Sequence, residues 1–108
     1  MENTIEALHK KILSGEIAIK DLVSSYVEKA KAENINAFRE VFSDIDEQVS
    51  AAEKMFAEGK ATALTGIPIA IKDNIMFAGH IAGACSHMLD HHRAAYDSTA
   101  VKALREAG

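Results

Sequence analysis

The sequence has few of the residues that mark the less common protein classes. It holds one proline and no tryptophan, and it contains no repeat or low-complexity tract, so a collagen-like chain or a proline-rich linker is excluded. Cys85 is the only cysteine and has no partner for an internal disulfide, so we expect a reducing compartment, the cytoplasm. No apolar run approaches the roughly 20 residues needed to cross a bilayer, and the polar N-terminus has no signal-peptide core, so we expect no membrane partner.

The chain also lacks an excess of positive charge. Twelve basic residues against sixteen acidic ones give a formal net charge of −4. Unaided binding of nucleic acid needs a clustered basic surface, so this composition argues against it. The 48% of apolar and 26% of charged residues are typical of a globular protein, and 108 residues correspond to one domain or part of one.

Apolar residues recur at helical spacing in four segments, which predicts four helices. The segments cover Ile5–Ile12, about Lys20–Ala32, the stretch between Ser43 and Gly59, and the stretch from Asp97 or Ser98 to Gly108. Ser14–Gly15 supplies a stop after the first helix, Ser43 is the expected cap of the third, and Asp97 or Ser98 is the expected cap of the fourth. The residues expected to face inward are Val49, Ala52 and Phe56 in the third helix, and Val101 and Leu104 in the fourth.

One further segment is apolar at both odd and even positions. Leu64–Ile71 is rich in isoleucine, with Pro68 near its start, which is typical of a strand buried on both faces of a parallel sheet. A glycine- and alanine-rich loop, Phe77–Ser86, separates it from the last helix. A strand followed by a helix is half of a parallel crossover, and the returning strand should come next. We therefore interpret residues 1–108 as the front segment of a single, larger α/β domain.

Lys72 closes this apolar segment and is followed at once by Asp73 and Asn74. Ligands bind at the carboxyl ends of strands in open α/β sheets, and burial favours the neutral form of a lysine, which can act as a base. Taken alone, the pattern also fits an exposed lysine at a turn, because most lysines stay in water. Asp73 and Asn74 could orient Lys72, bind the loop backbone or form a simple Asx turn.

The segment around Lys72 resembles a known motif. The run "GIPIAIKDNI", residues 66–75, is similar to the lysine motif of the amidase signature family. Four more segments follow the family's order and spacing, namely "SGEIAIKDLV" (14–23), "NAF" (36–38), "SHML" (86–89) and "YDSTAVKALREAG" (96–108). The resemblance covers essentially the whole chain. It implies the N-terminal portion of the amidase signature fold, incomplete as given, with three helices, a buried strand, a loop and a helix.

The resemblance also implies a reaction and a role for Lys72. The family hydrolyses amides through a serine–cis-serine–lysine triad, in which Lys72 would accept the proton that a bridging serine relays from the nucleophilic serine. The glycine- and serine-rich segment that carries both serines lies downstream in the family and has no counterpart in this sequence. Ser86 matches a serine upstream of that segment. We therefore expect Lys72 to be the one catalytic residue of this chain, and the chain alone to be inactive.

Within the family the pattern is most similar to the tRNA-dependent amidotransferases. That branch implies glutamine as the amide, partner subunits B and C, indirect contact with tRNA, and ATP and magnesium used by one of the partners. Two alternatives stay open: a generic amidase of small amides, and a non-catalytic assembly module that pairs through an apolar strand edge.

We expect the isolated chain to be marginally stable or self-associating. Ala18 stands where the family usually has a capping serine or threonine.

A histidine-rich segment is the main rival site. In "CSHMLDHH", residues 85–92, His87 and His91 lie four residues apart and would share one face of a helix. With Asp90 between them, the run is a near match to the H-x-x-E-H zinc sequence. Further possible ligands are His80, Cys85 and His92. Short motif matches are often accidental and the resemblance gives this segment no metal role, so we expect no metal or cofactor in this chain.

Overall fold

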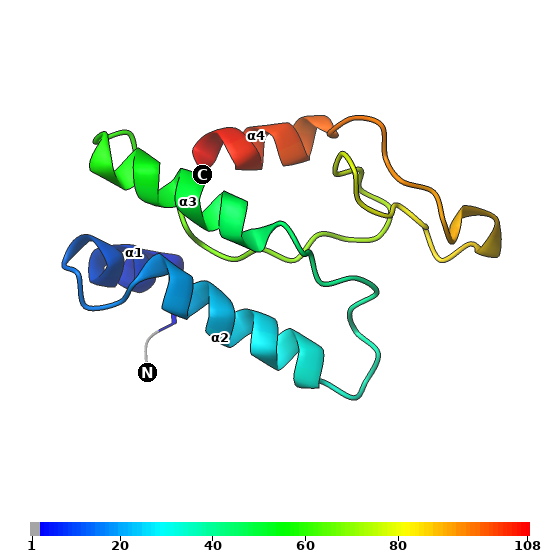
Figure 1. Ribbon diagram of the computed structural model, residues 1–108, viewed down its shortest axis with the longest axis horizontal. Coiled ribbons are helices and arrows are strands. Elements are labelled where there is room, and N and C mark those ends of the chain that lie inside the picture. Colours follow the sequence, from blue (N-terminus) through cyan, green and yellow to red (C-terminus); the bar gives the residue numbers. More distant parts are fainter. Residues whose placement is uncertain (1–2) are drawn as a thin grey trace. The chain divides into compact units, whose positions relative to one another are not determined.

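The structure is a computed structural model that describes residues 3–108 (Figure 1). This part of the chain forms four α-helices and one short 3-10 helix. It divides into two compact units, which we describe separately. Unit 1 extends to Pro68 and includes Ala107–Gly108, and unit 2 spans Ile69–Glu106. Within residues 3–108, no helix combines the length and the apolar character that crossing a membrane requires.

The first two helices of unit 1 lie where the apolar spacing predicts them. Helix α1 spans Ile5–Leu13, and the hydroxyl of its N-cap residue, Thr4, accepts a hydrogen bond from the N–H three residues further on at 3.2 Å. Gly15 follows with a φ of +75°, a left-handed conformation that glycine adopts easily, so the expected stop is confirmed. Helix α2 spans Ile19–Ala32 and begins at Ala18, which provides no side-chain cap.

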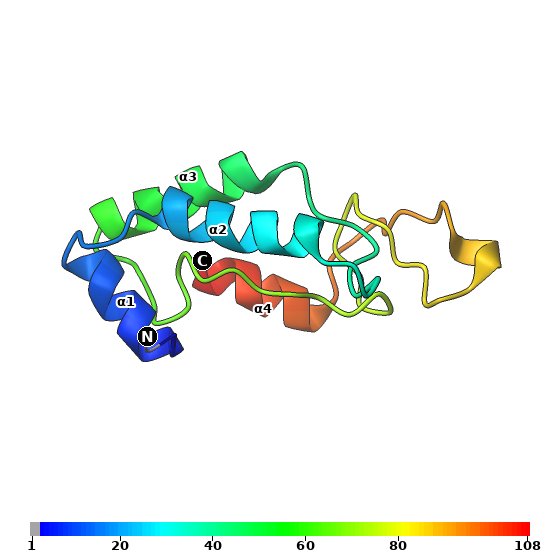
Figure 2. The same cartoon turned by 90° about the horizontal axis from the view of Figure 1, so that it is seen from below.

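Helix α3 spans Ile45–Ala57 and lies beside α2, as Figures 1 and 2 both show. A buried cluster joins the two helices, with Ile19 from α2 and Val49 and Ala52 from α3. Phe56 packs against this cluster and is partly buried. The inward-facing stripe predicted for this helix is therefore confirmed, and it is what holds α3 to α2.

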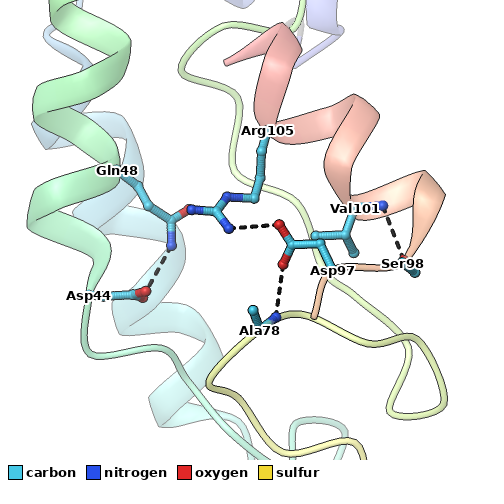
Figure 3. Close-up of polar contacts among 7 residues, drawn as sticks. All are labelled: Asp44, Gln48, Ala78, Asp97, Ser98, Val101 and Arg105. Atoms are coloured by element: carbon cyan, nitrogen blue, oxygen red, sulfur yellow. Dashed lines mark hydrogen bonds and ion pairs between the residues drawn. The ribbon is translucent and has the colours of Figure 1, made fainter. Parts of the chain in front are cut away.

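The N-terminus of α3 differs from the expectation by one residue. Asp44, and not Ser43, is the N-cap residue, and its side chain makes no capping hydrogen bond. The carboxylate of Asp44 instead accepts a hydrogen bond at 3.1 Å from the side-chain amide of Gln48, one turn further along (Figure 3). Asp46 and Glu47 lie in the first turn, where negative charge favours the positive end of the helix dipole.

The first residues of the segment predicted to be a strand lie in a hydrogen-bonded turn of unit 1. The hydroxyl of Thr65, which is fully buried, donates to the carbonyl of Ala107 at 2.7 Å. The N–H of Gly66 donates to the carbonyl of Gly108, also at 2.7 Å. Gly66 has a φ of +79°, and a Cβ atom at this position would come within 3.1 Å of the Ile19 side chain. Only glycine fits here without strain.

The predicted strand at Leu64–Ile71 is not formed, which corrects the expectation of a buried strand. A turn covers residues 63–66, and no backbone hydrogen bond joins Ile69–Ile71 to any other residue that the structure describes. Ile69 is 47% exposed, so burial on both faces is not observed either. A strand needs hydrogen bonds to a neighbour, and residues 3–108 supply no such neighbour. Their β-structure consists of one isolated bridge, Ile81–Arg93.

Unit 2 combines a folded-back loop with helix α4, which spans Thr99–Ala107. The antiparallel bridge Ile81–Arg93 brings the two arms of the loop together. On the same arms, the N–H of Gly79 donates to the carbonyl of Ala94, and the N–H of Ala94 donates to the carbonyl of His80, both at 2.9 Å. The predicted loop at Phe77–Ser86 is thus confirmed as non-helical.

Helix α4 is capped by the second of the two residues that the sequence offered. The hydroxyl of Ser98 accepts a hydrogen bond from the N–H of Val101 at 3.2 Å (Figure 3). Val101 is 1% exposed and Leu104 is partly buried, so the predicted inward face is confirmed. Val101 anchors the helix by removing its whole side chain from water.

Candidate functional site

The structure places Lys72 at the start of a tight turn in unit 2. Its carbonyl accepts a hydrogen bond from the N–H of Ile75 at 2.9 Å, which closes the turn Lys72–Ile75. The side chain of Lys72 is exposed. A lysine acts as a base only when its surroundings disfavour the ammonium, and residues 3–108 do not bury this one. The catalytic role of Lys72 stays a prediction.

Asp73, the residue after Lys72, binds the backbone of a loop ten to twelve residues away. One oxygen of its carboxylate accepts the N–H of Gly83 at 3.1 Å, and the other accepts the N–H of Cys85 at 3.3 Å. Its carbonyl accepts the N–H of Ala84, also at 3.1 Å. Binding of the loop backbone, one of the roles that the sequence left open for Asp73, is observed.

The loop bound by Asp73 has an unusual backbone conformation. Ala84 has a φ of +48° and Cys85 a φ of +57°, a left-handed conformation that residues with side chains rarely adopt. Backbone N–H groups of a turn can together bind an anion. In this loop the N–H groups of Gly83 and Cys85 both donate to the carboxylate of Asp73, which is the anion that they bind in this structure.

A second carboxylate holds the other end of unit 2. Asp97 accepts the N–H of Ala78 with one oxygen and the guanidinium of Arg105 with the other, each at 2.8 Å (Figure 3). The hydrogen bond from Ala78, supported by the charge of Arg105, lowers the pKa of the Asp97 carboxyl below its ordinary value. The guanidinium also lies over the ring of Phe77, with 4.9 Å to the ring centroid.

Sequence reasoning missed this second contact set. Asp97 stood out only as a candidate helix cap, and Ser98 takes that part. An arginine eight residues after an aspartate, across a helix N-terminus, has no recognised spacing rule. The partner of Asp97 on the loop, the N–H of Ala78, lies 19 residues away and is set by the folded-back chain alone.

The histidine-rich segment does not gather the residues of the rival metal site. A 3-10 helix, η1, spans His87–Leu89, so His87 and His91 do not share a helical face as the zinc motif requires. Nδ1 of His87 lies 3.1 Å from a carboxylate oxygen of Asp90, and the His87 side chain is exposed. Within residues 3–108, no group of three or more His, Cys, Asp or Glu side chains could hold a metal ion.

Unit 1 carries one further feature, a hollow of about 220 Å³ between α1 and α2. Its lining includes Lys11 from α1 and Asp21, Tyr26 and Lys29 from α2. The ammonium of Lys29 lies 5.2 Å from the centroid of the Tyr26 ring. None of the residues that the sequence singled out for chemistry lies in this hollow.

The chain belongs to the amidase family, because the family's sequence model, described as Amidase, matches residues 21–108. The match includes Lys72, Asp73 and the whole of unit 2, and it confirms the resemblance seen in the sequence. Residues 3–108 do not form the strand expected from the α/β fold that the resemblance implies.

The chain is also similar in sequence to individual curated proteins. It is 37% identical to the A subunit of the glutamyl-tRNA(Gln) amidotransferase of Fusobacterium nucleatum subsp. nucleatum, over 97% of this chain and 22% of that protein. The protein of the same name from Lactobacillus gasseri is 38% identical over 99% of this chain and 22% of its own length. That from Treponema denticola is 39% identical over 68% of this chain and 16% of its own length. The chain thus spans about a fifth of the length of the curated relatives it matches.

Proposed function

We propose that this chain contributes the N-terminal part of a glutamine amidotransferase that supplies ammonia for conversion of Glu-tRNA(Gln) to Gln-tRNA(Gln). The observation that carries the proposal is the motif at residues 66–75, in which Lys72 is the first residue of a tight turn. Membership of the amidase family and the similarity to amidotransferase A subunits support it.

In this proposal Lys72 is the base of a serine–cis-serine–lysine triad. The nucleophilic serine attacks the side-chain amide carbonyl of glutamine, and its proton passes through the bridging serine to the neutral amine of Lys72. The lysine ammonium returns this proton, through the bridging serine, to the amide nitrogen, so the C–N bond breaks, ammonia leaves and the acyl-enzyme forms with Lys72 neutral again. Water then releases glutamate from the acyl-enzyme. Both serines would come from the part of the enzyme downstream of residue 108, and that part would also bury Lys72.

The rest of the reaction is assigned to partners. Subunits B and C would complete the enzyme, and one of these partners would use ATP and magnesium to activate the glutamyl-tRNA that receives the ammonia. The exposed Lys72 and the unpaired backbone of Ile69–Ile71 are consistent with a segment whose neighbours lie in the remainder of the enzyme.

A chimera tests this proposal directly. Residues 1–108 replace the matching N-terminal part of the Fusobacterium nucleatum relative, which is then assembled with its own partner subunits. We expect the chimera to amidate Glu-tRNA(Gln) with glutamine as the nitrogen donor. Lys72→Ala should lower this activity at least roughly 100-fold, because general bases contribute about 10²–10⁴-fold to the rate. Lys72→Arg should fail equally, since a guanidinium keeps its charge and cannot accept the proton.

Two controls separate chemistry from folding. Ammonium chloride in place of glutamine bypasses the triad, so the Lys72 variants should keep the ammonia-dependent amidation of the unmodified chimera. Lys102→Ala removes another exposed lysine of unit 2 and should leave both activities unchanged. Glutamine-dependent activity that survives Lys72→Ala would show that Lys72 is not the base. Glutamine given to the isolated 108-residue chain should release no ammonia.

A further inference from the structure

We propose that Asp73 is a positioning residue for Lys72, which it holds in place by fastening the Lys72–Ile75 turn to the loop at Gly83–Cys85. This inference rests on the proposed function, because it concerns the placement of the proposed base. The resemblance that singles out Lys72 gives Asp73 no role. The inference is drawn from the contacts on either side of Lys72.

On its N-terminal side, Lys72 has no anchor within the described residues. The backbone of Ile69–Ile71 makes no hydrogen bond to any other residue between 3 and 108, and Ile69 is close to half exposed. The chain leading into Lys72 therefore does not fix the position of its Cα atom in this structure.

On its C-terminal side, Lys72 is anchored three times over through the next residue. Asp73 accepts N–H groups from Gly83 and Cys85 with its two carboxylate oxygens, and from Ala84 with its carbonyl. The turn itself is closed by the hydrogen bond from Ile75 to the Lys72 carbonyl. Since Asp73 directly follows Lys72, these bonds place the Cα atom of Lys72 relative to the loop.

The loop is shaped for a carboxylate. Ala84 and Cys85 are left-handed, and the N–H groups of Gly83 and Cys85 both donate to the carboxylate of Asp73, whereas that of Ala84 donates to the Asp73 carbonyl. A charged oxygen makes shorter and stronger hydrogen bonds to such N–H groups than a neutral one does. Asparagine has one acceptor and one donor in place of two acceptors, so its NH₂ group would face the N–H of either Gly83 or Cys85. Alanine would leave both N–H groups without their acceptor.

The test uses the active chimera and compares kcat with KM for glutamine. Asp73→Ala and Asp73→Asn should lower kcat about 10–100-fold, because a displacement of about 1 Å at a catalytic group costs up to roughly 10²-fold in rate. KM should change less than about twofold, since Asp73 contacts the loop and is not assigned to glutamine. Asp73→Glu keeps both acceptors and should recover part of kcat. Ammonia-dependent amidation should be unchanged in all three variants.

Asp97→Ala is the matched control. Asp97 also holds loop backbone in unit 2 through its carboxylate, at the N–H of Ala78, but its contacts do not involve the Lys72 turn. A variant at this site should keep kcat and KM within about twofold when assayed below its unfolding temperature. A purely structural role for Asp73 would make the two aspartate variants behave alike.

Each other result overturns the inference. Full kcat in both Asp73→Ala and Asp73→Asn would show that the position of Lys72 does not depend on the hydrogen bonds from the loop to the Asp73 carboxylate. An equal drop of kcat in Asp97→Ala, or loss of ammonia-dependent amidation in both Asp73 variants, would show general destabilisation. Failure of the proposed function is distinguished by Lys72 itself. If Lys72→Ala stays active, the base assignment fails, whereas an inactive Lys72→Ala beside a fully active Asp73→Ala overturns the positioning role alone.

Discussion

Helices α1 and α2 begin with nearly the same backbone geometry, but only one of them has a side-chain cap. Thr4 has φ −76° and ψ 153°, and its hydroxyl accepts the N–H of Ala7. Ala18 has φ −79° and ψ 140° and offers no acceptor. A serine at position 18 would hold its hydroxyl toward the N–H of Asp21, the residue that corresponds to Ala7. The side chain at position 18 is exposed, so the added hydroxyl costs no burial.

We therefore expect Ala18→Ser to stabilise unit 1 by about 1 kcal/mol, the usual difference between serine and alanine at an N-cap. With a urea m-value of about 1–3 kcal/mol per M, the unfolding midpoint should rise by roughly 0.3–1 M. Far-UV circular dichroism of the chain measures this, at protein concentrations where the midpoint no longer varies.

Two controls make the result specific to the cap. Thr4→Ala should lower the midpoint by a similar amount, because it removes a cap that the structure shows. Ala51→Ser places the same side chain at an exposed interior position of α3 and should be mildly destabilising, since serine is a poorer helix former than alanine. An unchanged midpoint in Ala18→Ser, or equal stabilisation by Ala51→Ser, would refute the capping argument.

Three further predictions follow from the contacts described above. Gly66→Ala should destabilise unit 1 by more than Gly15→Ala, because both need a left-handed backbone, at a cost of about 1–2 kcal/mol, but only Gly66 has a side chain 3.1 Å from the added Cβ. Urea midpoints of both variants check this. The pKa of Asp97 is lowered in the folded state, so the ionised carboxylate stabilises the fold at pH values above its ordinary pKa. This contribution to the free energy of unfolding is lost as pH falls toward the lowered pKa. Asp97→Asn should remove this part of the acid dependence of unfolding. The isolated chain should sediment partly as oligomers, and Ile69→Lys should shift it toward monomer by placing charge on the unpaired extended segment. A monodisperse, cooperatively unfolding monomer would contradict that last expectation.

The helices were predictable from the sequence because their hydrogen bonds and their end signals are local. Residues such as Val49 and Ala52 recur at a spacing that defines one face, and that face is buried in the structure. The differences fall at helix ends, where several residue types compete. Asp44 is the N-cap residue of α3 in place of Ser43, whereas Ser98, one of the two residues expected to cap α4, does so.

The predicted strand failed for the opposite reason. The apolar run at Leu64–Ile71 has the composition of a buried strand. Composition indicates that the segment can be buried, but it does not show whether another strand is present to pair with it. In residues 3–108 no backbone hydrogen bond pairs Ile69–Ile71 with a neighbour, and Ile69 is about half exposed. Lys72, directly after this segment, is also exposed.

The sequence by itself determined the four helices, the family and the identity of the candidate base, because these depend on local periodicity and on a contiguous motif around Lys72. Tertiary structure alone decided what surrounds that base. The partners of Asp73 lie ten and twelve residues away, and they meet its carboxylate only because the loop folds back with two residues in the left-handed conformation. Contacts of this kind depend on the path of the whole chain, so no short stretch of residues encodes them.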